Sequence, residues 1–283
     1  MLPSEHIINH LFRDKPFPLI MGILNITPDS FSDGNNYLEF DRAIDHAKLL
    51  IDQGADLLDI GGESTRPGSQ PVDPEVELKR VIPVIEAIKR SSNICISVDT
   101  QKSQVAQHAI EAGADIINDI SALRDDSQMI KLLADNPDIG IVLMHMRGEP
   151  ATMQNNVNYD NIMEDILSFL QERVTICIDN GIDENRLFLD PGIGFGKYKE
   201  HNLHILAHLE MLHSLGLPII VGASRKRFIN EINPAEPNER IAGSLAAAQF
   251  CLKAGIEMVR VHDVKAHKQF IEVTKAIKLA QQQ

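Results

Sequence analysis

The sequence predicts a parallel (β/α)8 barrel, the TIM-barrel fold of the α/β class, because short apolar segments alternate with amphipathic ones along the whole chain. The junctions between them also repeat: residues 54–59 (GADLLD) and 113–118 (GADIIN) are near copies, and 254–259 (AGIEMV) is a looser third. Each copy places a helix-ending glycine just before a strand. The length of 283 residues suits one such barrel. We therefore expect a single domain spanning 1–283, with residues 1–16 as an N-terminal extension.

Eight strands and eight helices are expected to alternate. The predicted strands are 18–25, 55–62, 94–100, 114–119, 140–145, 187–190, 218–226 and 257–263. The predicted helices are 41–53, 73–90, 103–112, 125–135, 159–180, 202–215, 239–254 and 266–281. A doubly wound open sheet is the alternative fold, but no GxGxxG motif follows the first strand to support it.

Composition and charge disfavour several kinds of function. The chain has 27 Lys and Arg against 40 Asp and Glu, a formal net charge of -13, which argues against nucleic acid or an anionic membrane as a partner. No apolar run approaches the ~20 residues of a membrane span. Cys95, Cys177 and Cys251 lie far apart in apolar segments, without the spacing of a zinc site. Reduced, buried thiols indicate a cytoplasmic protein.

Polar side chains follow the apolar part of most predicted strands. The carboxyl ends of barrel strands converge on one face, where catalytic and binding residues lie. One Asn or Asp after a strand more often caps a helix or shapes a turn, but a series of them indicates a site. The residues at these positions are Asn25, Asp99, Asn118, His145, Asp190, Ser224, Lys226, Arg260 and His262.

One part of this series suits a phosphate group. Asn25 ends the first predicted strand, and Arg260 and His262 lie in the last, which is its neighbour in a closed barrel. A guanidinium and an imidazole can bind phosphate oxygens, and the amide oxygen of Asn25 is free to ligate Mg²⁺. Mg²⁺ is usually held by few protein ligands together with substrate oxygens.

The other part suits a flat heterocycle. Asp99, Asn118 and Asp190 offer acceptors and an amide to ring N–H and amino groups. Lys226 can donate to a carbonyl or ring nitrogen of the same ligand. We expect His145 to be structural, because no HxH or HExxH motif accompanies it.

Three loops at this end of the barrel are long or rich in glycine. Those around residues 26–34 and 63–69 are too long for tight turns, so each is either a mobile surface segment or a lid. Gly192, Gly194 and Gly196 form a turn that looks like a phosphate-binding loop. Close approach of the backbone to a ligand ring explains these glycines equally well.

Eight motifs, one for each predicted strand and in chain order, carry a resemblance to a known family. They are 21–34 (MGILNITPDSFSDG), 59–69 (DIGGESTRPGS), 97–100 (SVDT), 117–121 (INDIS), 144–147 (MHMR), 189–197 (LDPGIGFGK), 222–226 (GASRK) and 260–263 (RVHD). The set resembles the dihydropteroate synthase family of pterin-binding barrels along nearly the whole chain. Ile193 stands where that family is expected to have Phe.

The resemblance implies a reaction of folate biosynthesis, in which p-aminobenzoate displaces diphosphate from (7,8-dihydropterin-6-yl)methyl diphosphate to form dihydropteroate. It implies Mg²⁺ on Asn25, diphosphate oxygens on Arg260 and His262, and a homodimer formed through outer helices near the C-terminal end. The residues implied for the pterin are Asp99, Asn118, Ile120, Met144, Asp190, Gly222 and Lys226, and Gly194 and Phe195 are implied for substrate binding. Those implied for p-aminobenzoate are Phe31, Thr65, Arg66, Pro67 and Ser224.

Such a reaction requires no covalent intermediate on the enzyme, because the aromatic amine is itself the nucleophile. Departure of diphosphate leaves a methylene cation conjugated with the pterin, and Asp33 is a candidate to stabilise it. The two long loops would exclude water that could capture the cation. The residues expected to be catalytic are therefore Lys226, Asp33, Arg260 and His262.

Two other interpretations share the predicted fold. One is the methyltetrahydrofolate-binding barrel of cobalamin-dependent methyltransferases, which holds a pterin with a similar set of Asp and Asn residues. Binding alone does not require the 224–226 motif or the 65–67 loop, whose presence favours the synthase. The other is a noncatalytic pterin-binding or scaffolding paralogue.

Asp190→Asn is expected to abolish pterin binding while leaving the fold intact, because the amide replaces an acceptor-only carboxylate with a group that also donates. Titration calorimetry with the pterin diphosphate measures the binding, and circular dichroism checks the fold. Unchanged affinity would remove Asp190 from this role.

Overall fold

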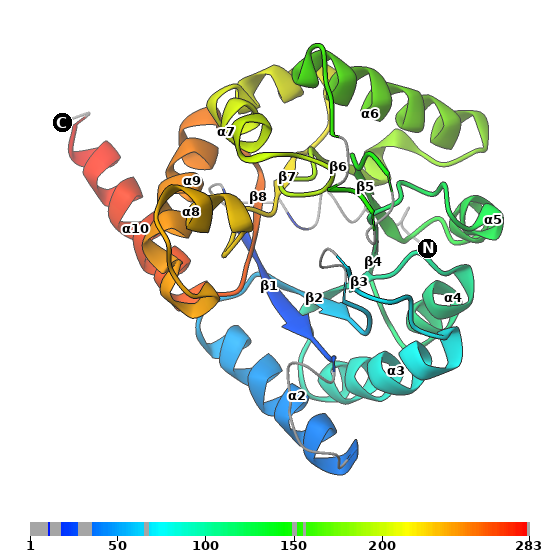
Figure 1. The fold of residues 1–283 in the computed structure, drawn as a ribbon. Helices are drawn as coiled ribbons and strands as arrows, with labels where there is room; N and C mark the ends of the chain where they lie inside the picture. The colour runs from blue at the N-terminus through cyan, green and yellow to red at the C-terminus, as the bar shows by residue number, and fades with distance from the viewer. Residues whose placement is uncertain are drawn as a thin grey trace.

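Parallel strands form the wall of a barrel that a ring of helices encloses, as Figure 1 shows in a view down the barrel. The computed structural model describes residues 11, 18–27, 36–64, 68–148, 152–154 and 157–281. Within those ranges the strands are β1 (Leu19–Asn25), β2 (Leu57–Gly61), β3 (Cys95–Asp99), β4 (Ile116–Asp119), β5 (Gly140–Met144), β6 (Leu187–Asp190), β7 (Ile220–Val221) and β8 (Met258–Val261). The predicted (β/α)8 barrel is confirmed.

Closure of the barrel depends on the pairing of the first strand with the last and on the contact between β6 and β7. β1 pairs with β2 on one side and with β8 on the other, through registers such as Asn25 with Gly61 and Met21 with Arg260. Between β6 and β7 the Leu189 amide donates to the Pro218 carbonyl at 2.9 Å, and Leu189 forms a parallel bridge with Ile219. The first and last strands are therefore neighbours, as the sequence predicts.

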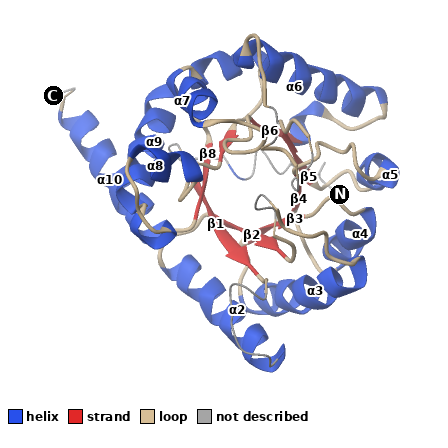
Figure 2. Cartoon of the chain, in the orientation of Figure 1, coloured by secondary structure: helices blue, strands red, loops and turns tan. Residues whose placement is uncertain are grey.

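The helices lie outside the strands in a continuous ring (Figure 2). They are α2 (Asn36–Asp52), α3 (Pro74–Ser91), α4 (Ser103–Glu111), α5 (Ser127–Asp135), α6 (Ile162–Asp179), α7 (Lys199–Ala207), α8 (Arg227–Ile232), α9 (Ile241–Ala254) and α10 (Val264–Ala280). Side-chain caps start several of them: Asp73 accepts from the Glu75 amide, Asp126 from the Gln128 amide and Asn161 from the Met163 amide. None of the helices in these ranges is long and apolar enough to cross a membrane.

Two predicted elements are wrong in extent. The predicted strand 218–226 is confined to β7, because Arg225 adopts a left-handed conformation (φ 57°) and the short helix α8, which was not predicted, starts at Arg227. The predicted helix 202–215 is split, because His208 leaves helical geometry (φ −130°) between α7 and the 3₁₀ segment Leu209–Leu215. The other predicted boundaries agree with the structure to within about five residues.

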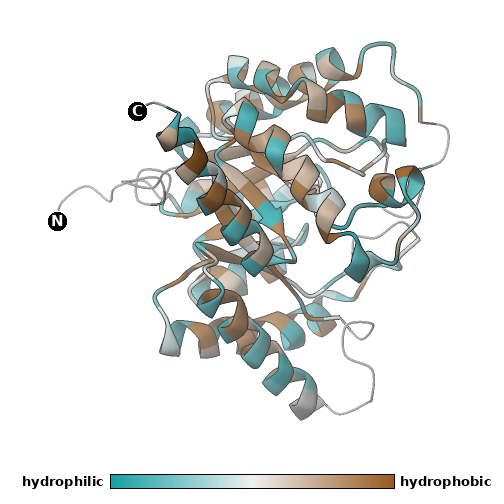
Figure 3. Cartoon of the chain, turned by 90° about the vertical axis from the view of Figure 1, so that its left-hand side faces the viewer, coloured by the Kyte–Doolittle hydropathy of each residue, from teal (hydrophilic) through white to brown (hydrophobic). Residues whose placement is uncertain are grey.

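Alternation along the strands sorts their side chains into an outer and an inner core. Residues such as Leu58, Ile96 and Val259 face the helices and belong to the large cluster between strands and helices. The outer helices in Figure 3 alternate between hydrophobic and hydrophilic residues along their length. The intervening residues fill the amino-terminal half of the barrel with a second apolar cluster of Leu11, Leu19, Met21, Leu57, Ile116, Val142, Phe188, Ile220 and Met258. Leu11 is the part of the predicted 1–16 extension that lies among the described residues.

The same alternation places polar residues above this inner apolar layer. Two residues beyond Leu57, Ile116, Phe188 and Met258 are the buried or half-buried Asp59, Asn118, Asp190 and Arg260. Because the period is two, these side chains point into the barrel toward the carboxyl ends of the strands. The fold thus converts isolated polar residues in apolar strands into a single layer.

Candidate functional site

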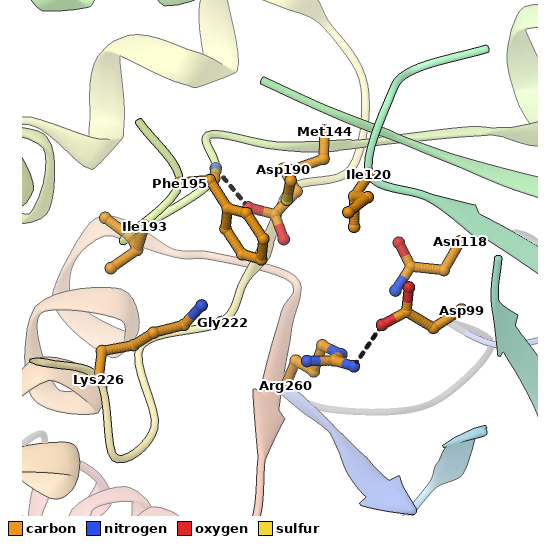
Figure 4. A pocket seen from close by; sticks show the side chains of 11 residues that line it. Asp99, Asn118, Ile120, Met144, Asp190, Ile193, Phe195, Gly222, Lys226 and Arg260 are labelled. Carbon is orange, nitrogen blue, oxygen red and sulfur yellow. Dashed lines mark hydrogen bonds and ion pairs between the residues drawn. The ribbon is translucent and has the colours of Figure 1, made fainter. Parts of the chain in front are cut away.

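A pocket opens at the carboxyl ends of the strands, above the polar layer. The residues that line it come from β3, β4, β5, β6 and β8 and from the segments that follow β4, β6 and β7. They are Asp99, Asn118, Ile120, Met144, Asp190, Gly192, Ile193, Phe195, Gly222, Lys226 and Arg260 (Figure 4). Every pterin-site residue named from the sequence is among them, and so is Phe195; Gly194 is not, but it lies in the same loop as Gly192 and Ile193.

Arg260 connects β8 to β2 and β3 across the barrel. Its Nε donates to Asp59 Oδ2 at 2.6 Å, and its Nη2 donates to Asp99 Oδ2 at 2.9 Å, the contact drawn in Figure 4. Burial opposes the charge of the guanidinium, but the carboxylates of Asp59 and Asp99 outweigh it and raise the pKa of Arg260. The cation is therefore fixed at the floor of the pocket.

Asp59 is a buried site residue that the sequence analysis did not single out. It is fully buried, and its Oδ2 also accepts from Asn118 Nδ2 at 3.2 Å. Its Oδ1 and the nearby Ser97 Oγ have no hydrogen-bond partner among the described residues. An aspartate between Leu58 and Ile60 in a buried strand is unusual. Asp59 lies two residues after Leu57, which faces into the barrel, and this spacing is the sequence signal that predicts an inward-facing Asp59.

Asp99 is buried against the Arg260 guanidinium. Burial raises its pKa, Arg260 acts in the opposite direction, and Asp59 reinforces the rise. The carboxylate that accepts from Arg260 Nη2 has further acceptor capacity for a ligand donor.

Asp190 and Lys226 face the pocket from the side opposite Asp99 (Figure 4). Asp190 Oδ1 accepts from the Gly192 amide at 2.6 Å, which leaves Oδ2 open to a ligand. Burial raises the pKa of Asp190. Lys226 Nζ lies 4.1 Å from the centre of the Phe195 ring, and burial followed by repulsion from Arg260 lowers its pKa to about 8.

The pocket also has an apolar wall. A small cluster of Ile120, Met144, Met146, Met153 and Phe195 packs together beside the polar groups. Polarizable and aromatic side chains on one side and carboxylates with an amide on the other form a slot for a flat, hydrogen-bonding ring.

Asn25, Ser224 and His262 lie at the mouth of the barrel. Asn25 is level with Gly61 and Asp99 in the strand registers, and its Oδ1 is 3.5 Å from the point that a Cβ on Gly61 would occupy. Ser224 Oγ contacts both the amide and Nδ1 of His262 at 3.2 Å. Burial and the neighbouring Arg260 lower the pKa of His262 to about 3, so its imidazole is neutral.

The predicted division into two separate chemistries needs a correction at Arg260. The sequence analysis grouped it with Asn25 and His262, yet its guanidinium is paired with Asp59 and Asp99 on the heterocycle side. The two groups of residues are therefore electrostatically joined through this side chain.

His145 points away from the pocket, as expected for a structural residue. It is buried, its ring packs edge-on against Phe169, and its Nδ1 is 2.9 Å from Lys197 Nζ. The expected site residues Phe31, Asp33, Thr65, Arg66 and Pro67 lie outside the described residues. In the described ranges no group of three or more His, Cys, Asp or Glu side chains could hold a metal ion by itself.

Comparisons with known proteins agree with this geometry. The family model "Pterin binding enzyme" matches residues 21–262. A dihydropteroate synthase of Bacillus subtilis is 47% identical over 251 residues, covering 89% of this chain and 85% of the relative. The Yersinia pestis dihydropteroate synthase, solved with a sulfonamide drug complex, superposes with a TM-score of 0.87 at 43% identity, covering 92% of this chain and 94% of that one. The Xanthomonas albilineans enzyme in complex with 7,8-dihydropteroate has a TM-score of 0.83 at 42% identity, with coverages of 92% and 94%.

His262→Asn is expected to flatten the loss of stability in mild acid. The folded-state pKa of about 3 lies below the unfolded value of 6.5, so the neutral imidazole contributes stability above pH 6.5 that is lost as pH falls through 3. At pH 5 the variant should therefore lose about 1–2 kcal/mol less than wild type, relative to pH 7.5. Urea unfolding at both pH values measures this difference. Equal losses in the two proteins would show that His262 titrates normally.

Proposed function

The chain belongs to the pterin-binding enzyme family and, within it, to the dihydropteroate synthases, and we propose in atomic terms how it joins p-aminobenzoate to a dihydropterin. It is a transferase of folate biosynthesis, which condenses p-aminobenzoate with (7,8-dihydropterin-6-yl)methyl diphosphate to give 7,8-dihydropteroate and diphosphate. The observation that carries the proposal is the placement of Asp99, Asn118, Asp190 and Lys226 around one slot with an apolar wall.

This slot complements the bicyclic head of a dihydropterin. Asp190 Oδ2 would accept hydrogen bonds from the amino group and ring N–H of the pyrimidinone, and Lys226 would donate to its carbonyl or a ring nitrogen. Asn118 and Asp99 would meet the opposite edge of the ring. Met144 and Ile120 would pack against the ring face.

The mouth of the barrel suits the diphosphate. Asn25 supplies a hard oxygen ligand at the level of Asp99, and a diphosphate supplies the others that Mg²⁺ prefers, so the donor set fits this ion. Bound there, Mg²⁺ would neutralise the leaving group. The neutral His262 would donate a hydrogen bond to a diphosphate oxygen, and Arg260 would supply positive charge from beneath; Ser224, which contacts His262, remains expected at the p-aminobenzoate site.

We assign no covalent nucleophile to the protein, because the aromatic amine attacks the methylene carbon itself. The residues orient the dihydropterin so that its C–O bond points to the mouth, and Lys226 with Asp99 and Asp190 fixes the ring whose electrons delocalise the developing cation. Asp33 remains the expected stabiliser of that cation. Phe31, Thr65, Arg66 and Pro67 remain expected at the p-aminobenzoate site by family resemblance.

Two further properties are proposed. Cys95, Cys177 and Cys251 form no disulfide, and burial is the first cause that raises the pKa of Cys177 and Cys251; both observations support a reducing, cytoplasmic location. A groove of about 350 Å³ lies between α7, α8 and α9. The apolar side chains of Leu203, Ile232 and Phe250 line this groove and are exposed, which supports a homodimer. The neighbouring α10 in Figure 3 also carries hydrophobic residues on its outer side.

Purified protein is expected to release diphosphate only when p-aminobenzoate, the pterin diphosphate and Mg²⁺ are all present, and a sulfonamide should inhibit the release. A methyltetrahydrofolate-binding barrel would bind a reduced folate without releasing diphosphate, and a noncatalytic paralogue would bind the pterin without turnover.

Positional isotope exchange in the bound diphosphate substrate tests the order of bond breaking. Absence of C–O cleavage before the amine binds would contradict a dissociative route, in which diphosphate departs and leaves the methylene cation before the amine attacks.

Phe250→Glu is expected to shift the protein from dimer to monomer in size-exclusion chromatography with light scattering, because the charge would be buried against a second copy. Leu49→Glu on α2 is the matched control, since Leu49 is 50% exposed and Phe250 is 49% exposed. A monomeric wild type, or a dimer that survives the Phe250 change, would count against this interface.

A further inference from the structure

Lys197 is a buried lysine that the mechanism above does not use. It ends the segment after β6, is 2% exposed, and its Nζ makes three contacts: His145 Nδ1 at 2.9 Å, the Phe195 carbonyl at 3.0 Å and the His145 carbonyl at 3.1 Å. These three acceptors equal the three N–H donors of an ammonium group. His145 can accept at Nδ1 when its ring proton resides on Nε2, and burial followed by repulsion from Lys197 keeps its pKa low.

The contacts of Lys197 bridge two elements of the barrel. His145 directly follows β5, whereas Phe195 belongs to the segment 191–196 that follows β6 and covers the pocket. The Lys197 amino group therefore fastens that segment, which we call the β6 loop, to the end of the neighbouring strand. Burial is the first cause that lowers the pKa of Lys197 to about 7, and both its ammonium and its amine form can donate hydrogen bonds to these acceptors.

The backbone of the β6 loop packs so closely against the segment after β5 that two of its glycines have no room for a side chain. A Cβ on Gly192 would lie 2.0 Å from the His145 carbonyl oxygen, and one on Gly196 would lie 2.4 Å from the Arg147 carbonyl oxygen. Both glycines have positive φ, at 67° and 59°. The loop is thus pressed against the segment that follows β5, at the point where Lys197 bonds to it.

Other side chains hold the remaining backbone groups of the loop. Gln154 Nε2 donates to the Gly194 carbonyl at 2.8 Å, and Tyr159 Oη donates to the Gly196 carbonyl at 2.9 Å. Asn202 Oδ1 accepts from the Gly194 amide at 2.7 Å. Lys197 differs from these three because it contacts both His145 and the carbonyl of Phe195, the residue whose ring reaches the ligand slot.

We propose that Lys197 is a positioning residue of the pterin pocket, whose buried amino group clamps the β6 loop to the end of β5 and so fixes the Phe195 ring beside Lys226. This role rests on the proposed function. Its effect should fall on the pterin and not on p-aminobenzoate, because the loop contributes to the slot for the heterocycle. Asp190 immediately precedes this loop and accepts from its Gly192 amide at 2.6 Å, a contact that does not involve Lys197.

Lys197→Met tests the proposal, since methionine approximates the length of the side chain without its donors. The Kd of the pterin diphosphate, measured by calorimetry without p-aminobenzoate, should rise about tenfold, as for loss of one net hydrogen bond. The KM for p-aminobenzoate should stay within about twofold. Should this variant fail to fold, Lys197→Gln, which keeps two donors on a shorter side chain, should give a smaller rise in the same Kd and again leave the KM for p-aminobenzoate unchanged.

Lys89→Met is the matched control for a merely structural loss. Lys89 is also partly buried and donates to Asp115 Oδ2 at 2.6 Å and to the Ile94 carbonyl at 3.1 Å, but at the amino-terminal ends of the strands. It should lower thermal stability and leave the Kd of the pterin diphosphate at the wild-type value.

A double-mutant cycle with Phe195→Ala tests whether Lys197 acts through the ring. The double variant should bind the pterin diphosphate no more weakly than Phe195→Ala alone. Three results would each overturn the proposal. The first is a wild-type Kd for the pterin diphosphate in Lys197→Met, and the second is a rise in its KM for p-aminobenzoate as large as the rise in that Kd. The third is a Kd of the double variant that equals the product of the two single fold-changes. Failure of the wild-type protein to bind the pterin diphosphate would instead overturn the proposed function.

Discussion

Burial of the Arg260 guanidinium between Asp59 and Asp99 is the interaction on which the site depends. Transfer of any one of these charges into a barrel interior would cost several kcal/mol without a partner, so each is retained only because the others are present. The two contacts join β8 to β2 and β3 across β1, which makes closure of the barrel and formation of the pocket floor one event. Burial is the first cause of the raised pKa of Asp190 and of the lowered pKa of Lys226, and the charge of Arg260 opposes the first shift and reinforces the second.

Much of the fold follows from sequence periodicity, and the failures have identifiable causes. Alternating apolar and amphipathic segments predicted the barrel because each strand must bury both faces and each helix only one. The extent of β7 was not predictable, because the apolar run continues to Ala223 while the left-handed Arg225 ends the strand through tertiary contacts. Helix α8 is only six residues long and carries no clear amphipathic pattern.

The sequence predicted which residues belong to the site better than it predicted how those residues are paired. Strand ends identified Asp99, Asn118, Asp190 and Lys226, but Asp59 escaped notice because it lies in mid-strand, two residues before the mouth. Counting in steps of two from Leu57 would have found it. Protonation behaviour could not be foreseen, since the raised pKa of Asp99 and the lowered pKa of His262 come first from burial, which sequence does not specify residue by residue. The pairing of Arg260 across the barrel is likewise a property of closure.

Arg225 forms a bidentate salt bridge with Asp263, from the turn after β7 to the residue after His262. Along the chain, Ser224 and Lys226 flank Arg225, and His262 directly precedes Asp263. The proposed subsites for the diphosphate and the heterocycle therefore share this salt bridge as a support, and a substitution that displaces either of its ends should misalign both reactants.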